Sequence, residues 1–152
     1  INAIHIGEVG PEEMLVAVDE LGCVTAWFTA ALEHPPIRLE ARESAWGIAT
    51  HGPAYLLAVS ANSFHVTVWD LHDYFKAGAR FLPRRTATRS VEMPLGEGCK
   101  RRELVGHTHN VPGISISTCG RWLASCSIDG SVRVWRLCDG QCIMQRHFGS
   151  VW

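Results

Sequence analysis

One stretch of the sequence decides the fold: Trp122-Leu-Ala-Ser-Cys-Ser-Ile-Asp-Gly-Ser-Val-Arg-Val-Trp135. Residues 122–127 form a short apolar run bounded by turn residues, which is typical of a buried strand. Asp129-Gly130 is expected to form a two-residue hairpin turn, because glycine reaches positive φ at no steric cost. Beyond the turn, residues 131–137 alternate like a strand, with the two valines set against serine, arginine and tryptophan. The stretch therefore predicts a β-hairpin whose second strand carries a tryptophan.

The same order of strand, turn, strand and tryptophan occurs twice more upstream. Met14–Trp27 and Tyr55–Trp69 align with the first stretch when the tryptophans are superposed. The tryptophans are separated by 42 and then 66 residues, so an insertion of about 24 residues in the second interval would restore a constant period. A period near that value is typical of a propeller blade, which holds four strands in roughly 40 to 45 residues.

The predicted fold class is all-β: a β-propeller fragment of about three four-stranded blades. The blades are expected at residues 1–43, 44–105 and 106–147, with a basic insertion at about 74–100 and with 148–152 starting a following segment. The fragment does not close a propeller by itself, since closure typically takes four to eight blades. No stretch predicts a convincing helix. Strands are expected at 2–6, 15–19, 24–29, 37–40, 45–50, 55–61, 65–71, 102–105, 113–117, 122–127, 131–137 and 141–147.

The composition is that of a soluble globular protein. Of the 152 residues, 47% are apolar and 19% are charged, and the formal net charge is -1. This balance excludes disordered and collagen-like chains. The sequence contains neither a secretory signal peptide nor an apolar run of the roughly 18 to 20 residues that a spanning helix needs, so we expect no membrane association. Because the sequence begins at Ile1 and not at Met, we also expect a segment of a longer protein.

The cysteines predict an intracellular protein. Six cysteines would suit three disulfides in a secreted domain, but the sequence has no Asn-x-Ser/Thr acceptor. Cys23, Cys119 and Cys126 lie in or beside apolar runs, where a free thiol behaves as a small hydrophobic group. We expect reduced thiols and an intracellular location. The spacing of Cys138 and Cys142 favours ordinary turn cysteines over a zinc site.

Gly106-His107, followed by Leu123–Trp135, resembles the WD-repeat pattern, with Arg136 in place of the final aspartate. The second repeat keeps Trp69-Asp70, and the first keeps only the strand, turn, strand and tryptophan. The resemblance implies that the three blades are of the WD type. It also implies a structural tetrad in the third blade, formed by His107, Ser127 or alternatively Ser125, Asp129 and Trp135.

A narrower resemblance covers roughly residues 1–137. Three stretches are similar to the fungal constitutive-RNR-transcription family of WD-repeat regulators: Ser44-Ala-Trp-Gly-Ile-Ala-Thr-His51, Ala58-Val-Ser-Ala-Asn62 followed by His65-Val-Thr-Val68, and Gly106-His-Thr-His-Asn-Val-Pro-Gly-Ile-Ser115. The resemblance implies a fungal, nuclear or nucleocytoplasmic protein. It further implies a non-enzymatic role in transcriptional regulation of ribonucleotide reductase genes and the DNA-damage response.

We expect no enzyme, no catalytic residues and no cofactor. His107, Ser127 and Asp129 supply the three groups of a catalytic triad on paper, but the serine lies in a run with core-like neighbours and not in an open cleft. The groups are therefore expected to satisfy one another inside the blade. His107-Thr-His109 is a weak metal pattern without a nearby carboxylate, and we expect no metal site.

The central insertion is strongly basic. Residues 74–102 hold eight basic and two acidic residues, whereas residues 1–73 hold ten acidic and two basic ones. Three interpretations stay open for the insertion: a nuclear-import signal, an anion-binding or nucleic-acid-binding segment, or a solvated loop. The residues that would serve the first two are Arg84, Arg85, Lys100, Arg101 and Arg102.

The function that the resemblance implies is a non-catalytic protein-interaction scaffold in transcriptional control, with transcription factors and the remaining blades of the same chain as partners. The alternative is a substrate receptor of a cullin-type ubiquitin ligase, which would bind ligase adaptors. Such receptors often carry Trp-Asp-x-Arg, and neither Trp69-Asp-Leu-His72 nor Trp135-Arg-Leu-Cys138 matches that motif. An enzyme ranks third among the functions, and nucleic acid ranks below proteins as a partner.

Overall fold

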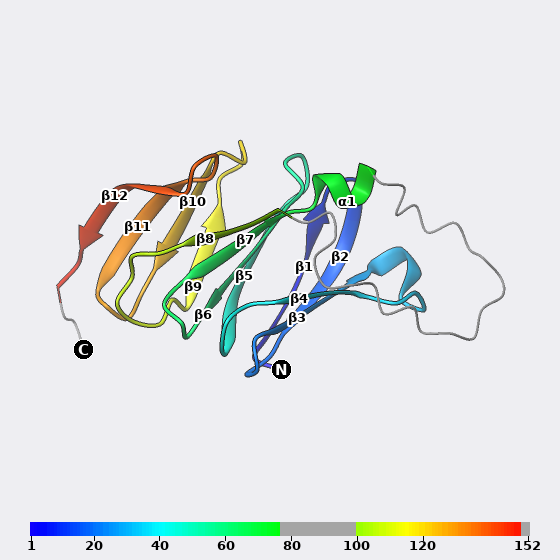
Figure 1. Ribbon diagram of the computed structural model, residues 1–152, viewed down its shortest axis with the longest axis horizontal. Coiled ribbons are helices and arrows are strands. Elements are labelled where there is room, and N and C mark those ends of the chain that lie inside the picture. Colours follow the sequence, from blue (N-terminus) through cyan, green and yellow to red (C-terminus); the bar gives the residue numbers. More distant parts are fainter. Residues whose placement is uncertain (77–99, 150–152) are drawn as a thin grey trace.

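The computed structural model describes residues 1–76 and 100–149, and in these residues the fold is three four-stranded antiparallel sheets (Figure 1). In each sheet the strands pair in chain order, and the three sheets stand side by side without closing into a ring. The expected all-β, unclosed fold is therefore confirmed. The strands are β1 (Ala3–Val9), β2 (Glu12–Val18), β3 (Cys23–Phe28) and β4 (Ile37–Glu40); β5 (Ala45–His51), β6 (Leu56–Ala61), β7 (Val66–Asp70) and β8 (Lys100–Leu104); and β9 (Gly113–Ile116), β10 (Trp122–Cys126), β11 (Ser131–Arg136) and β12 (Gln141–His147).

The sheets pack face to face through two apolar cores. The first strands β1, β5 and β9 are neighbours in the array, and one core fills each interface between successive sheets. Trp69 is 3% exposed in the first core and Trp135 is 1% exposed in the second. Each of these tryptophans thus packs against the preceding sheet. Trp27, the equivalent residue of the first sheet, is only half-buried.

The turns between the second and third strands share one geometry. In the third sheet, the N–H of Ser127 donates to the carbonyl of Ser131, and that of Gly130 donates to the carbonyl of Ser127. The loop therefore contains three residues, so the expected two-residue turn is wrong. The last loop residue has positive φ in all three sheets: 82° at Gly22, 67° at Phe64 and 78° at Gly130.

Sheets 2 and 3 are also joined by a buried serine. The strand β5 bulges between Ala45 and Ile48, and Ser60 Oγ accepts a 3.0 Å hydrogen bond from the freed N–H of Gly47. The same hydroxyl donates a 2.6 Å bond to the carbonyl of Val111, in the loop that leads into β9. Because Ser60 is fully buried, the hydroxyl fixes the position of the third sheet against the second.

Two short helices contradict the expectation that no helix forms. The α-helix α1 (His72–Lys76) follows β7, and a single 3₁₀ turn covers Thr29–Ala31. The Asp70 carboxylate accepts a 2.9 Å bond from the N–H of His72, and Tyr74 is buried in the first core. A five-residue helix is too short for a hydrophobic period to reveal, which explains the omission.

The cysteines are not small core residues. Cys23, Cys119, Cys126, Cys138 and Cys142 are free and exposed, so the expected burial of the first three is wrong. They lie at strand ends, in a turn, or on the side of β10 opposite Leu123 and Ser125. Among residues 1–76 and 100–149, no helix has the length and hydropathy to cross a bilayer.

Candidate functional site

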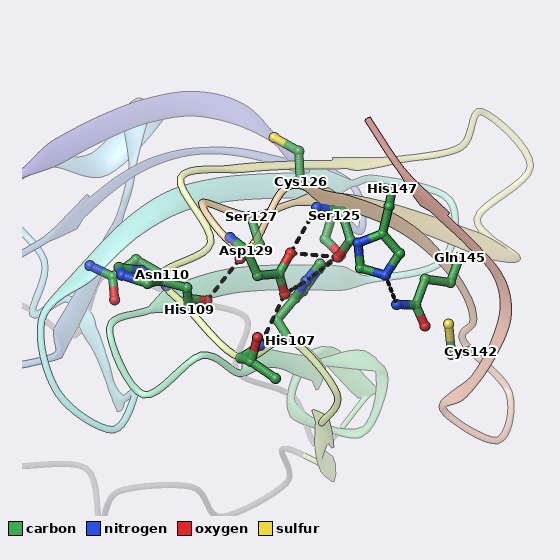
Figure 2. Close-up of polar contacts among 12 residues, drawn as sticks. His107, His109, Asn110, Ser125, Cys126, Ser127, Asp129, Cys142, Gln145 and His147 are labelled. Atoms are coloured by element: carbon green, nitrogen blue, oxygen red, sulfur yellow. Dashed lines mark hydrogen bonds and ion pairs between the residues drawn. The ribbon is translucent and has the colours of Figure 1, made fainter. Parts of the chain in front are cut away.

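The third sheet holds a buried chain of hydrogen bonds, and Figure 2 labels three of its members, His107, Ser125 and Asp129. The indole N–H of Trp135, on β11, donates a 2.8 Å bond to Ser125 Oγ, on β10. Ser125 Oγ lies 2.7 Å from Nε2 of His107, whose Nδ1 lies 2.9 Å from Oδ2 of Asp129. Because an indole can only donate and a carboxylate can only accept, the consistent arrangement has Ser125 donating to Nε2 and the Nδ1–H of His107 donating to Asp129.

The Asp129 carboxylate is the best-satisfied group in this network. It accepts bonds from the N–H of Thr108 at 3.0 Å and from the N–H of Ser131 at 2.8 Å, and the Ser131 hydroxyl donates a 2.5 Å bond to it. Burial acts to raise the pKa of Asp129, but the bonds from Ser131, Thr108 and His107 outweigh it and hold that pKa far below its usual value. Asp129 is therefore ionised.

The imidazole of His107 is neutral. Its side chain is 1% exposed, and burial lowers its pKa more than the neighbouring Asp129 carboxylate raises it. Arg133, whose guanidinium carbon lies 5.8 Å from the centre of the Trp135 ring, also lowers the pKa. A neutral ring can accept the Ser125 proton at Nε2, in agreement with the direction of the hydrogen bonds.

The tetrad serine is Ser125, and the choice of Ser127 is wrong. Ser127 Oγ donates a 3.0 Å bond to the carbonyl of His109 and accepts a 3.1 Å bond from the N–H of Asp129. Ser127 lies beyond the end of β10, whereas Ser125 is on the strand, 2% exposed, on the face that carries Leu123. Strand alternation therefore directs Ser125 into the interface with the second sheet.

The arrangement braces the blade and offers no open nucleophile. It ties β10, β11 and the loop before β9 together, and Ser125 Oγ is enclosed between the indole and imidazole rings.

Sequence reasoning missed two members of the network, Ser131 and Thr108. The Asp-Gly-Ser turn was a signal for Ser131, because an aspartate in a turn often accepts a hydrogen bond from the N–H two residues ahead.

We call the hydrogen-bonded chain of Trp135, Ser125, His107 and Asp129 the brace. It occurs in one of the three sheets described. Register aligns the pairs Leu15–Trp27 and Leu57–Trp69 with Leu123–Trp135. The position of Ser125 is then Ala17 in the first sheet and Val59 in the second, and that of Asp129 is Leu21 and Ser63. Neither of those sheets can form the same four-residue chain.

Three of the basic residues singled out in the sequence, Lys100, Arg101 and Arg102, lie on strand β8 and have partners within the chain. Lys100 pairs with Asp73 at 3.2 Å, and Arg101 pairs with Glu103 at 2.8 Å. Arg102 donates a 2.6 Å bond from Nη1 to the carbonyl of Leu137 in the third sheet. The expected insertion therefore ends before Lys100, and strand β8 begins two residues earlier than expected. Arg84 and Arg85 lie outside the described residues.

The chain is similar to proteins that contain WD repeats. Residues 98–136 match the family described as WD domain, G-beta repeat. A WD40 repeat-containing protein of Dictyostelium discoideum is 38% identical over 136 residues, which are 89% of this chain and 17% of that protein. An uncharacterized WD repeat-containing protein of Schizosaccharomyces pombe is 28% identical over 155 residues, covering 100% of this chain and 30% of that protein.

A shorter similarity involves a ribosome biogenesis protein BOP1 homolog of Oryza sativa, which is 41% identical over 49 residues, or 32% of this chain and 7% of that protein. The chain thus spans less than a third of the length of each of these relatives. The matched repeat, the relatives and the three unclosed four-stranded sheets together support a WD-repeat protein that carries blades of the propeller type.

Proposed function

We propose that the chain is a non-catalytic scaffold that binds other proteins. The observation that carries this proposal is the enclosure of Ser125 and His107. These two residues could act as nucleophile and base. As whole residues they are 2% and 6% exposed, and both are engaged in hydrogen bonds inside the blade. A substrate could reach them only after the packing between the second and third sheets opened. The comparison with WD-repeat proteins supports the same class of function.

For the biological process, we propose transcriptional regulation of ribonucleotide reductase genes, in the nucleus, the cytoplasm or both. The three stretches that resemble the fungal regulators meet at one buried junction. Gly47 belongs to the first, Ser60 to the second and Val111 to the third, and the Ser60 hydroxyl joins them. The resemblance therefore covers a contiguous structural unit, which supports the proposal more than scattered identities would.

Ribosome biogenesis is a second candidate process. It is favoured by the similarity to the BOP1 homolog of Oryza sativa and by a U3 small nucleolar RNA-associated protein 21 homolog of Schizosaccharomyces pombe, which is 43% identical over 28% of this chain. A cullin-ligase receptor receives less support, since neither Trp69-Asp-Leu-His72 nor Trp135-Arg-Leu-Cys138 carries the Trp-Asp-x-Arg motif.

Affinity purification of the full-length protein followed by mass spectrometry separates these roles. Transcription factors or chromatin proteins among the partners would support the transcriptional role, and ribosome assembly factors would support the second candidate. Cullin adaptors would favour the ligase receptor. A purified protein that binds no protein but turns over a small substrate would contradict the scaffold proposal itself.

A further inference from the structure

One end of the molecule is a continuous surface of loops and turns. It lies at the lower end in Figure 1, where the N-terminus is marked. We call it the turn surface, and backbone hydrogen bonds join its segments in two groups, one in the first two sheets and one in the third. The N–H of Ala41 donates to the carbonyl of Gly22, that of Asn62 to Ser44, and that of Ile128 to Asn110. The turn surface comprises residues 19–22, 41–44, 62–65, 105–110 and 127–130, apart from His107 and Asp129, whose side chains are only 1% and 7% exposed and belong to the buried network.

Large apolar side chains stand exposed along the turn surface, at least one from each sheet. Leu21 is 78% exposed in the first sheet, Phe64 is 38% exposed in the second, and Ile128 is 51% exposed in the third. Val105, in the loop between the second and third sheets, is 59% exposed. A run of exposed apolar groups on a bonded framework is typical of a protein-binding surface.

Phe64 is the most informative of these residues. Its φ of 67° is a left-handed conformation that disfavours any side chain, and glycine occupies the same turn position in the other two sheets. Its ring contacts His109 with the centroids 5.8 Å apart, and Phe64 belongs to neither apolar core. Residues held in strained conformations often serve binding, so the phenylalanine is better explained by a ligand than by stability.

The charges on the turn surface indicate the chemistry of the partner. Glu20 and Glu43 are exposed on it, and no ion pair in the described part of the chain engages either carboxylate. Arg42, which precedes Glu43 in the chain, directs its guanidinium to Glu103 at 3.1 Å. The first-sheet half of the turn surface is therefore negative, and it complements cations while repelling nucleic-acid phosphates.

We propose that the turn surface binds a segment of a partner protein in which large apolar side chains are flanked by lysine or arginine. The apolar side chains would contact Leu21, Phe64 and Ile128, and the cations would lie beside Glu20 and Glu43. The inference rests on the proposed scaffold function and adds the location and the chemical class of the partner.

The test is a selection of random twelve-residue peptides, displayed on phage, against the full-length protein. Enriched peptides should combine Leu, Ile, Phe or Trp with adjacent Lys or Arg. Binding of the synthesised peptides should weaken at least tenfold in Phe64→Gly, and the pair Glu20→Gln and Glu43→Gln should weaken it further. Phe64→Gly should melt no lower than the wild type, because glycine accepts this φ freely. The matched control is Leu32→Ser, which removes a side chain 56% exposed in the loop after the 3₁₀ turn, away from the turn surface.

Peptides that bind Phe64→Gly as tightly as the wild type would overturn the turn-surface proposal while leaving the scaffold function intact. Peptides without positive charge would overturn the assigned partner chemistry. If no peptide is enriched although affinity purification recovers partners, the turn surface is likewise wrong and the scaffold stands. Failure of both experiments would count against the scaffold itself.

Discussion

The indole N–H of Trp135 donates a 2.8 Å hydrogen bond to Ser125 Oγ, and both residues are nearly inaccessible to water. The bond crosses from β11 to β10 and continues to His107. Removing the hydroxyl would leave two buried nitrogen atoms, one on each ring, without a partner. An unsatisfied buried group costs roughly 1 to 3 kcal/mol, which is large against a typical stability of about 5 to 15 kcal/mol.

Ser125→Ala is therefore expected to lower the melting temperature of the full-length protein clearly, whereas Ser127→Ala should lower it little. Ser127 is half-exposed and bonds the carbonyl of His109, which water can also satisfy. Thermal unfolding of the two variants, followed by circular dichroism, compares the same chemical change two residues apart. A greater loss in Ser127→Ala would refute the assignment of Ser125 to the tetrad.

The pH dependence of stability should follow His107 and Asp129. The pKa of His107 is lowered in the folded protein, so the unfolded chain takes up the proton first. Stability should fall as the pH drops below about 6.5, the ordinary histidine value. The pKa of Asp129 is also lowered, so its contribution is complete above about 3.9 and is lost as the pH falls further.

Nuclear magnetic resonance of the His107 ring tests the first of these expectations. Its titration midpoint should lie below the ordinary histidine value, while urea unfolding shows less stability at pH 5 than at pH 7. A His107 midpoint above the ordinary value would contradict the neutral, buried ring.

The junction at Ser60 offers a third test. Ser60→Ala would leave the N–H of Gly47 and the carbonyl of Val111 without their hydrogen-bond partner, at a cost of roughly 1 to 3 kcal/mol for each group left unsatisfied. Ser63→Ala, in the neighbouring half-exposed turn, is the matched control. Urea unfolding of the full-length variants should show a clear loss for Ser60→Ala only. Equal stability of the two variants would mean that water or a backbone shift replaces the Ser60 bonds.

Residues 1–152 are expected to aggregate or to unfold without cooperativity when produced alone. The first sheet exposes Ile4 at 69% and Ile6 at 59% and leaves Trp27 half-buried, and the third exposes Ile143 at 47% and Met144 at 38%. Apolar surface of this extent on two open sheets promotes association. Analytical ultracentrifugation and thermal unfolding check this. A monomer that unfolds cooperatively without a partner would contradict the expectation.

Sequence reasoning reached the architecture because a repeated pattern carries it. The tryptophans at 27, 69 and 135 gave the period, and the alternation around them gave the strands. The same reasoning could not choose between Ser125 and Ser127, because two residues that are two positions apart lie on the same face of an extended strand. Only the end of β10 at Cys126 separates them.

The exposed surfaces were the least predictable feature. Leu21 and Ile128 look like core residues in the sequence, but they lie in turns that project from the sheets. The positive φ of Phe64 had no sequence signal either, because a phenylalanine occupies a position where glycine marks the turn in the other sheets. Side-chain direction at a turn depends on the backbone conformation and not on a hydrophobic period.

The central claim is that the tetrad is a structural brace of a binding scaffold, and Asp129→Ala tests it most directly. The melting temperature of the full-length variant and its binding of a purified partner, counted per folded molecule, are measured on one sample. Asp139→Ala, at an exposed turn of the same sheet, is the control. The account predicts a markedly lower melting temperature with unchanged binding per folded molecule. An Asp129→Ala protein that melts like the wild type yet loses its partner would show that Asp129 is a recognition residue and would contradict the account.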